Sequence, residues 1–364
     1  MNTKITRLEY CGIKDNVDDA TTYAEISANC RSAMRDALRV GDLSAYAYAS
    51  IGLAESSRRD GNAKQAESSH VLSLRIFTEL SDRTGLGRVY WSIGNLRRQE
   101  SRYSEALVSL NKAYRISKAC DDQLCALYSL SGIAETTRIL GSYRTSLVQH
   151  KRCLVLYNRI SDHRGIVWAL EGIAQIYKNM GRYTDSLRLF CQANKISQLT
   201  GDYRGVGYAV KGIGECQMAI KPQSESGISS ILTSCLIFEN LKFRIGHGYA
   251  KKTLGDSYVI AGNIPKALET YKEARDIFLG IKNLRGLAYV FLGLAEISFL
   301  SGDLQYGIYY SMIARSYFNA KSLRYGLWKS NVLLAKWVPL SCMSQIAEKE
   351  TSDFLSLSYL LDKI

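Results

Sequence analysis

The sequence predicts an all-α fold, a right-handed superhelical solenoid in which about seven helix–turn–helix units stack between capping helices. Its 364 residues carry near copies of one short string: IGLAE at 51–55, SGIAE at 131–135, EGIAQ at 171–175, KGIGE at 211–215 and LGLAE at 292–296. Such a period is typical of repeat proteins, whose units bury their cores against their neighbours. With only three prolines, the chain allows long helices nearly throughout.

The period is 40 residues. One small residue, here called the marker, lies where the two helices of each unit are expected to cross, and successive markers are 40 residues apart except for one spacing of 41: Ala54, Gly94, Ala134, Ala174, Gly214, Gly255 and Ala295. Mostly apolar side chains precede each marker by one and by four positions, which is one face of a helix. The predicted organisation is a helical cap at 1–41, an array of about seven units at 42–340 and a capping helix at 341–364.

Turns between the helices are marked by two recurrent residue types. A chain breaker follows each marker at a steady distance: Gly61, Ser101, Gly141, Gly181, Lys221, Gly262 and Gly302. Aspartate recurs every 40 residues just before the next unit: Asp42, Asp82, Asp122, Asp162 and Asp202. Because an aspartate side chain accepts hydrogen bonds from the first backbone N–H groups of a helix, we expect these residues to cap the incoming helices.

Composition excludes several classes of function. The nine cysteines form no CxxC pair and the four histidines are scattered, so we predict buried reduced thiols and no metal site. His70 and His150 fall at one place in two units, where packing is expected. No phosphate-loop, HExxH or GxSxG motif occurs, so no cofactor and no catalytic residue is predicted, and an enzyme is disfavoured. Without an apolar run long enough for a membrane span or a signal-peptide core, a soluble cytoplasmic protein is expected.

The net charge of +13 is spread along the chain without a polybasic run. Such a charge is typical of proteins that bind acidic partners. Alternatively, it belongs to a charged surface that only contacts water.

The units resemble the tetratricopeptide repeat across about residues 42–340. The resemblance rests on the small crossing residues, on aromatics such as Tyr177 and Tyr183, and on columns such as Ser186, Phe190 and Ala193 in the second helix. These units are longer than the 34-residue form and lack its closing proline. They are similar to the 40-residue variety found in Leu-Gly-Asn adaptor repeats, for which GRVYWSIGN at 87–95 is the nearest match, and in bacterial peptide-sensing regulators.

The resemblance implies that ligands bind the concave face, lined by the first helix of each unit. Four columns then face the groove, six before, three before, one after and four after the marker. The first column is aromatic except for one arginine: Tyr48, Arg88, Tyr128, Trp168, Tyr208, Tyr249 and Tyr289. The second varies: Ile51, Trp91, Ser131, Glu171, Lys211, Lys252 and Leu292. The third is acidic or an amide: Glu55, Asn95, Glu135, Gln175, Glu215, Asp256 and Glu296. The fourth is basic in four units and then apolar: Arg58, Arg98, Arg138 and Lys178, followed by Met218, Val259 and Phe299.

Each column has a structural alternative. The aromatics could pack between helices, the third column could pair with the fourth at i, i+3 spacing, and the basic column could be a solvated face. The predicted ligand residues are the first and third columns, the basic part of the fourth, and the second-column residues Trp91, Glu171, Lys211 and Lys252.

These columns favour a non-enzymatic scaffold that binds a peptide or protein segment with acidic character, in a groove that is basic in its N-terminal half and apolar in its C-terminal half. An alternative is a small-molecule site or an enzyme, in which Glu171 or Glu215, walled by Trp168 or Tyr208, acts as a general base or holds a cation. Nucleic acid is disfavoured because the acidic column would repel phosphates. The oligomeric state stays open.

Overall fold

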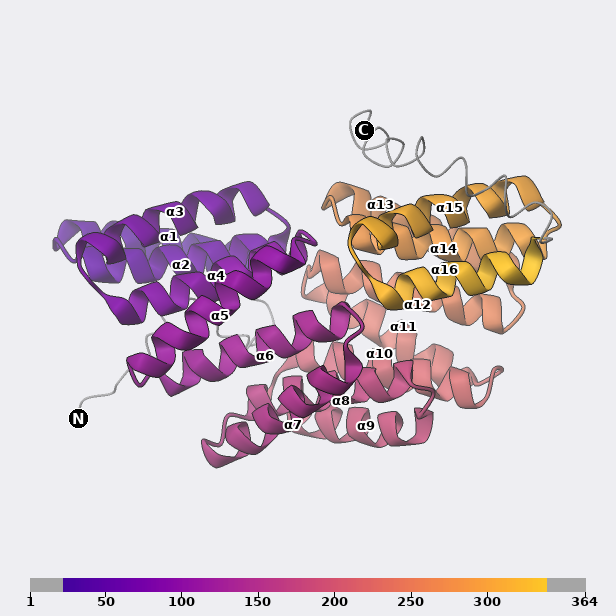
Figure 1. The fold of residues 1–364 in the computed structure, drawn as a ribbon, viewed down its shortest axis with the longest axis horizontal. Coiled ribbons are helices and arrows are strands. Elements are labelled where there is room, and N and C mark those ends of the chain that lie inside the picture. The colour runs from indigo at the N-terminus through magenta and orange to yellow at the C-terminus, as the bar shows by residue number, and fades with distance from the viewer. Residues whose placement is uncertain (1–21, 339–364) are drawn as a thin grey trace.

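The computed structural model describes residues 22–338, and every regular element within this range is an α-helix, which confirms the predicted all-α solenoid (Figure 1). Helix α1 (Tyr23–Arg39) precedes seven consecutive helix pairs, and α16 (Arg324–Trp337) follows them. The pairs are α2 (Leu43–Asp60) with α3 (Ala63–Glu79), α4 (Arg83–Gln99) with α5 (Tyr103–Ala119), α6 (Gln123–Ile139) with α7 (Tyr143–Arg159), α8 (His163–Asn179) with α9 (Tyr183–Thr200), α10 (Tyr203–Ile220) with α11 (Glu225–Asn240), α12 (Arg244–Ile260) with α13 (Ile264–Gly280), and α14 (Leu284–Leu300) with α15 (Leu304–Ala320). The predicted capping segment at 341–364 lies outside the described residues.

Short turns of one design join the helices. One residue in nearly every turn has a left-handed φ, and glycine holds this conformation at least cost: Gly41, Gly61, Ser81, Ser101, Asp121, Gly141, Ser161, Gly181, Gly201, Lys242, Gly262, Lys282, Gly302 and Ser322. The exception is Lys221, which is extended at φ −132° and leads through Pro222 into a longer turn between α10 and α11. That turn contains the extra residue that makes one spacing 41.

The recurrent aspartates cap the helices as the sequence predicts. Each side chain accepts a hydrogen bond from the backbone N–H three residues later, at 2.8–3.2 Å, in α2, α4, α6, α8 and α10. The cap satisfies one of the N–H groups that a helix N-terminus leaves without an intrahelical partner.

Replacing Asp162 by alanine is therefore expected to lower the free energy of unfolding by about 1 kcal/mol, because the cap bond to Gly165 N–H (3.2 Å) is lost. Urea unfolding followed by circular dichroism measures this change. Asp36→Ala is the matched control, since Asp36 is exposed and pairs only at the surface with Arg39, and it should shift the midpoint little. Equal shifts for the two variants would contradict the capping role.

Close helix approach explains the glycines that lie two residues before the markers. A Cβ added at Gly172 would lie 2.3 Å from the His150 ring, and one at Gly293 would lie 2.3 Å from the Tyr271 ring. The side chains of the preceding second helix therefore lie where a Cβ would be, and this close packing accounts for glycine at these positions. His70 and His150 are both buried, in accordance with the predicted packing role.

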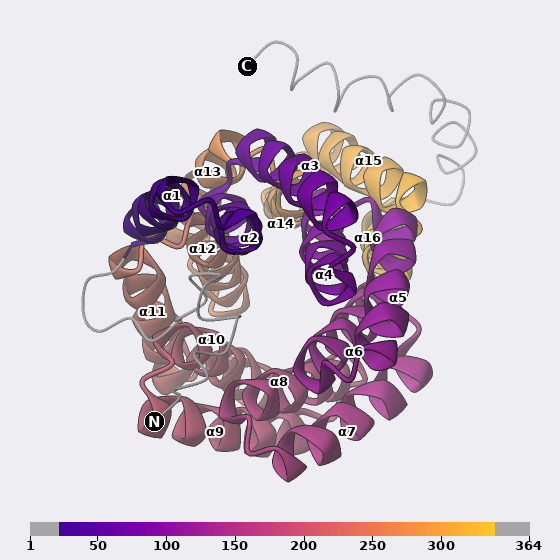
Figure 2. The same cartoon turned by 90° about the vertical axis from the view of Figure 1, so that its left-hand side faces the viewer.

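The pairs coil into a ring, with the first helix of each pair inside and the second outside (Figure 2). One turn of the coil brings distant units together. The Tyr317 hydroxyl donates to Ser101 Oγ at 2.7 Å, and Tyr103 packs in one apolar cluster with Tyr317 and Leu323. As a result, α4 and α6 face the interior of the ring together with α14 and α16.

Candidate ligand-binding cavity

The interior of the ring contains a cavity of about 510 Å³. It is lined by side chains from every first helix from α2 to α14 and from α16. This volume falls within the roughly 300–1,000 Å³ of small-ligand sites. Of the predicted ligand residues, all but Tyr48, Arg88 and Glu296 line it. Ligand binding by these residues stays a prediction.

Tyr48 and Arg88, from the first column, make contacts between units. The Tyr48 hydroxyl donates to Asp82 at 3.0 Å, and Arg88 Nε donates to Asp122 at 2.9 Å. Both acceptors are helix-capping aspartates of the following unit. These two side chains therefore fix the orientation of one first helix relative to the next.

The other aromatics of the first column both pack and line the cavity. The ring of Tyr208 lies 5.0 Å from that of Phe238, and the ring of Tyr249 lies 4.9 Å from that of Phe278. Both tyrosines also belong to the cavity wall. Packing against the second helix holds each ring in one orientation, so its cavity-facing edge is preorganised.

Ion pairs join the third and fourth columns. Arg58 contacts Glu55 at 2.7 Å, and Arg138 binds Glu135 through two hydrogen bonds of 2.7 and 2.6 Å. Burial alone would raise the pKa of Glu135, but Arg138 and Arg98 hold it at about 2. The structural pairing considered for these columns is therefore present.

In the next units the pairing changes register. Lys178 contacts Glu215 of the following unit at 2.6 Å, and Lys211 lies 3.5 Å from the same carboxylate. Burial would raise the pKa of Glu215, but Lys178 and Lys211 lower it strongly. Every carboxylate of the third column that lines the cavity has at least one cationic partner.

The predicted apolar C-terminal half of the groove is wrong. Met218 and Phe299 are buried and Val259 packs into an apolar cluster, and none of the three lines the cavity. Apolar side chains gain free energy by leaving water, and at this edge of the helix a neighbouring helix can cover them. Phe299, for example, stacks on Trp337 of α16 with ring centroids 5.9 Å apart.

Polar residues that the four columns omit line the C-terminal half instead. Arg204 and Arg285 lie ten residues before their markers, one helical turn before the first column, so extending the same face by a turn would have found them. Tyr325 and Lys329 come from α16, which follows the last complete pair.

The cavity is predominantly basic. Ten lining side chains are arginine or lysine and five are aspartate or glutamate. The cations are Arg58, Arg59, Arg98, Arg138, Lys178, Arg204, Lys211, Lys252, Arg285 and Lys329, and the carboxyl groups are Glu55, Glu135, Glu171, Glu215 and Asp256. The wall of the cavity therefore has about twice as many cationic as acidic side chains.

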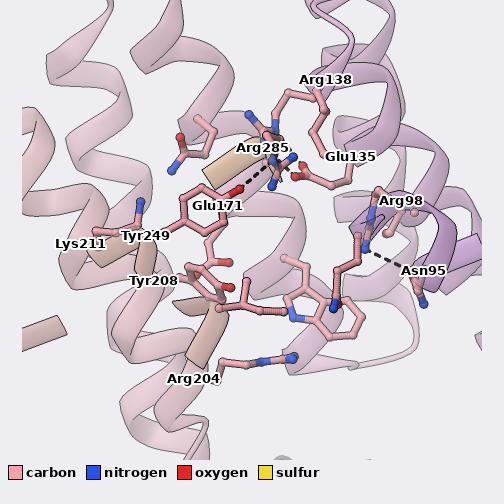
Figure 3. Close-up of a pocket in the computed structure, with 18 of the residues that line it drawn as sticks. Asn95, Arg98, Glu135, Arg138, Glu171, Arg204, Tyr208, Lys211, Tyr249 and Arg285 are labelled. Carbon is pink, nitrogen blue, oxygen red and sulfur yellow. Dashed lines mark hydrogen bonds and ion pairs between the residues drawn. The ribbon is translucent and has the colours of Figure 1, made fainter. Parts of the chain in front are cut away.

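Glu171 differs from the other acidic residues of the cavity. It lies in the cavity wall with Trp168 and Tyr208, and its Oε1 atom is buried without a hydrogen-bond partner among residues 22–338 (Figure 3). Burial, with a smaller contribution from Asp202, raises its pKa well above the usual range. A raised pKa favours the protonated form of the carboxyl group, which can donate a hydrogen bond to a ligand.

Neither a metal site nor a membrane-spanning helix is found in the part of the chain that the structure describes. No group of three or more His, Cys, Asp or Glu side chains is placed to hold a metal ion there. None of its helices is long and apolar enough to cross a membrane. Most of its cysteines are buried free thiols, as predicted, while Cys191 is exposed.

Comparison with known proteins supports the repeat assignment. Residues 45–119 match the sequence model of the tetratricopeptide repeat. No curated protein matches the sequence.

Three solved structures share the fold. A Rap protein complexed with Competence and Sporulation Factor aligns with a TM-score of 0.54 at 14% identity, over 89% of this chain and 99% of that one. The Rap conjugation gene regulator of plasmid pLS20, in complex with the Phr* peptide, aligns with a TM-score of 0.62 at 12% identity, over 83% and 79%. The apo form of RapI aligns with a TM-score of 0.53 at 11% identity, over 80% and 99%. At these identities the likeness establishes a common fold.

Proposed function

We propose that this tetratricopeptide-repeat protein is a non-enzymatic scaffold that holds a peptide segment with acidic groups in its superhelical cavity. The observation that carries the proposal is the two-to-one excess of cations over carboxyl groups on an aromatic wall. The pLS20 regulator, which shares the fold, holds the Phr* peptide in its solved structure, and this supports a peptide as the ligand.

The wall offers what an extended peptide needs. Asn95 and Gln175 provide amide donors and acceptors for a main chain, and the edges of Trp91 and Trp168 offer apolar contact. Arg98 makes its side-chain hydrogen bond with the neutral Asn95 Oδ1 at 3.1 Å and has no ion pair among the described residues. Its charge is available to a carboxylate, which a guanidinium binds with two parallel hydrogen bonds.

A small-molecule ligand is the second candidate, and the buried Glu171 favours it. Its Oε1 atom has no hydrogen-bond partner among residues 22–338 and lies in the wall with Trp168 and Tyr208, and small-ligand sites use a few such polar groups for specific contacts. Native mass spectrometry separates the candidates: a bound compact metabolite would support the second, and a bound peptide the first.

The charge-reversal variant Arg98→Glu/Arg138→Glu is expected to weaken peptide binding by more than about tenfold, because two cations of the wall become anions. The probe is a mixture of synthetic short peptides, half of them rich in Asp and Glu. Bound members are identified by mass spectrometry, and affinities are then measured by calorimetry. Wild-type protein should enrich the acidic members.

The matched control reverses the same number of charges on the exposed outer helix α3, as Lys64→Glu/Arg75→Glu. It should keep wild-type affinity, and both variants should keep the helical circular dichroism spectrum. Unchanged affinity in the cavity variant, or no acidic enrichment by the wild type, would refute the proposal.

A further inference from the structure

Three arginines from distant units meet on one side of the cavity. Arg98 comes from α4, Arg138 from α6 and Arg285 from α14, and all three line the wall. Figure 3 shows the Arg138 and Arg285 side chains meeting beside Glu135, with Arg98 on the same side. Closure of the superhelical turn brings Arg285 to the other two, since Arg285 lies in the seventh helix pair and Arg98 and Arg138 lie in the second and third.

The cluster has one carboxylate for its three guanidinium groups. Glu135 pairs with Arg138 through two hydrogen bonds. Arg98 binds the neutral amide of Asn95, and Arg285 Nε donates to the Tyr249 hydroxyl at 2.8 Å. Among the described residues, two positive charges are therefore left without an ion-pair partner.

Repulsion among these guanidinium groups costs free energy. Like charges repel more strongly in a half-buried cavity than in water. Burial lowers the pKa of Arg98 to about 10, and Arg58 and Arg285 contribute to the shift. The guanidinium nevertheless stays charged at neutral pH, so a bound anion would relieve the repulsion.

We propose that Arg98, Arg138 and Arg285 form a subsite for a group that carries two negative charges within the reach of one residue. Two sources have this chemistry: a phosphoryl group, and the paired carboxylates of an aspartate or glutamate at the C-terminus of a peptide. Either one neutralises the two unpaired guanidinium charges and matches their planar, two-pronged donor geometry. The inference rests on the proposed function, because it assigns the acidic end of the ligand to this subsite.

The test titrates the full chain with inorganic phosphate, succinate and acetate at low salt, by calorimetry. Wild-type protein should bind one dianion at least about tenfold more tightly than acetate, since the second negative charge adds at least one charge-assisted hydrogen bond. Tighter binding of phosphate than of succinate would assign the subsite to a phosphoryl group, and the reverse order to paired carboxylates.

Arg285→Gln and, independently, Arg98→Gln should each weaken dianion binding by about tenfold. Lys64→Gln is the matched control, because Lys64 is exposed on the outer helix α3 and does not line the cavity; its affinity should stay within about twofold of the wild type. Two variants on different helices guard against the failure of one to fold.

The subsite is refuted if wild-type protein binds acetate as tightly as the dianions, or if both cluster variants bind them like the control. A failure of the subsite proposal can be distinguished from a failure of the peptide-binding scaffold. Peptides that bind without a dianionic end would leave the scaffold standing and remove the subsite, whereas dianion binding without any peptide binding would do the opposite.

Discussion

Replacing Tyr271 by alanine is expected to lower the free energy of unfolding by roughly 3–5 kcal/mol, the range for deleting a large aromatic side chain from a core. Tyr271 of α13 is fully buried. Its ring lies between two glycines, so that an added Cβ would come within 2.7 Å of it at Gly255 and 2.3 Å at Gly293. Its hydroxyl donates to Asp256 at 2.6 Å. Truncation would leave a cavity between two units and remove the hydrogen-bond donor to a carboxylate.

Chemical unfolding followed by circular dichroism measures this loss, and because repeat arrays can unfold in segments the whole transition should be compared. Tyr271→Phe separates the two contributions, since it removes only the hydroxyl and should cost about 1–2 kcal/mol. Tyr309→Ala on α15, where the tyrosine is 45% exposed, is the matched control. A Tyr271→Ala loss no larger than that of Tyr309→Ala would contradict this packing.

Replacing Glu55 by glutamine is expected to lower the free energy of unfolding by about 3 kcal/mol at neutral pH, because it removes a buried negative charge that Arg58 and Arg59 both contact. The Glu55 carboxylate is 1% exposed and contacts Arg58 at 2.7 Å and Arg59 at 3.9 Å. Ser92 Oγ also donates to it at 2.7 Å. Glutamine keeps the size of the side chain but loses the charge.

The same substitution predicts a pH dependence. Burial would raise the pKa of Glu55, but Arg58 and Arg59 lower it to about 2. Because the folded pKa lies below the unfolded value of about 4.3, the carboxylate stabilises the protein fully above that value and loses this effect as the pH falls toward 2. The stability difference between wild type and Glu55→Gln should therefore shrink between about pH 4.5 and pH 2.

Glu79→Gln is the control for this series, since Glu79 is exposed and pairs at the surface with Arg75. It should change stability by less than about 1 kcal/mol at every pH. A difference for Glu55→Gln that stays constant down to pH 2 would contradict the role assigned to its carboxylate.

The local features of the fold were predictable because they depend on short segments. Capping by Asp42 or Asp162 needs only the turn and the first residues of the helix that follows. The left-handed turn residues recur with the same period, and the one exception coincides with the extra residue near Lys221. The residues that produce these features recur in the sequence at fixed spacing.

The shape of the cavity depends on the sum of many small rotations between units, which no single spacing encodes. The contact between Ser101 and Tyr317, and the meeting of Arg285 with Arg98 and Arg138, arise from that sum. Most of the residues that the sequence places on the concave face line the cavity, while the limits of the lined face differ from the four columns. Met218 is buried in the core. Arg285, which lies one helical turn before the first column, lines the cavity.

Whether a peptide lies inside the cavity is tested most directly by tryptophan fluorescence. Trp91 and Trp168 line the cavity, whereas Trp328 and Trp337 do not. The probe is the peptide most enriched by the wild-type protein from the synthetic mixture. Its titration should change the emission saturably in wild-type protein and in Trp328→Phe/Trp337→Phe, and the change should be lost in Trp91→Phe/Trp168→Phe. A change that persists without the cavity tryptophans and disappears without the outer pair would place the ligand elsewhere and contradict the account.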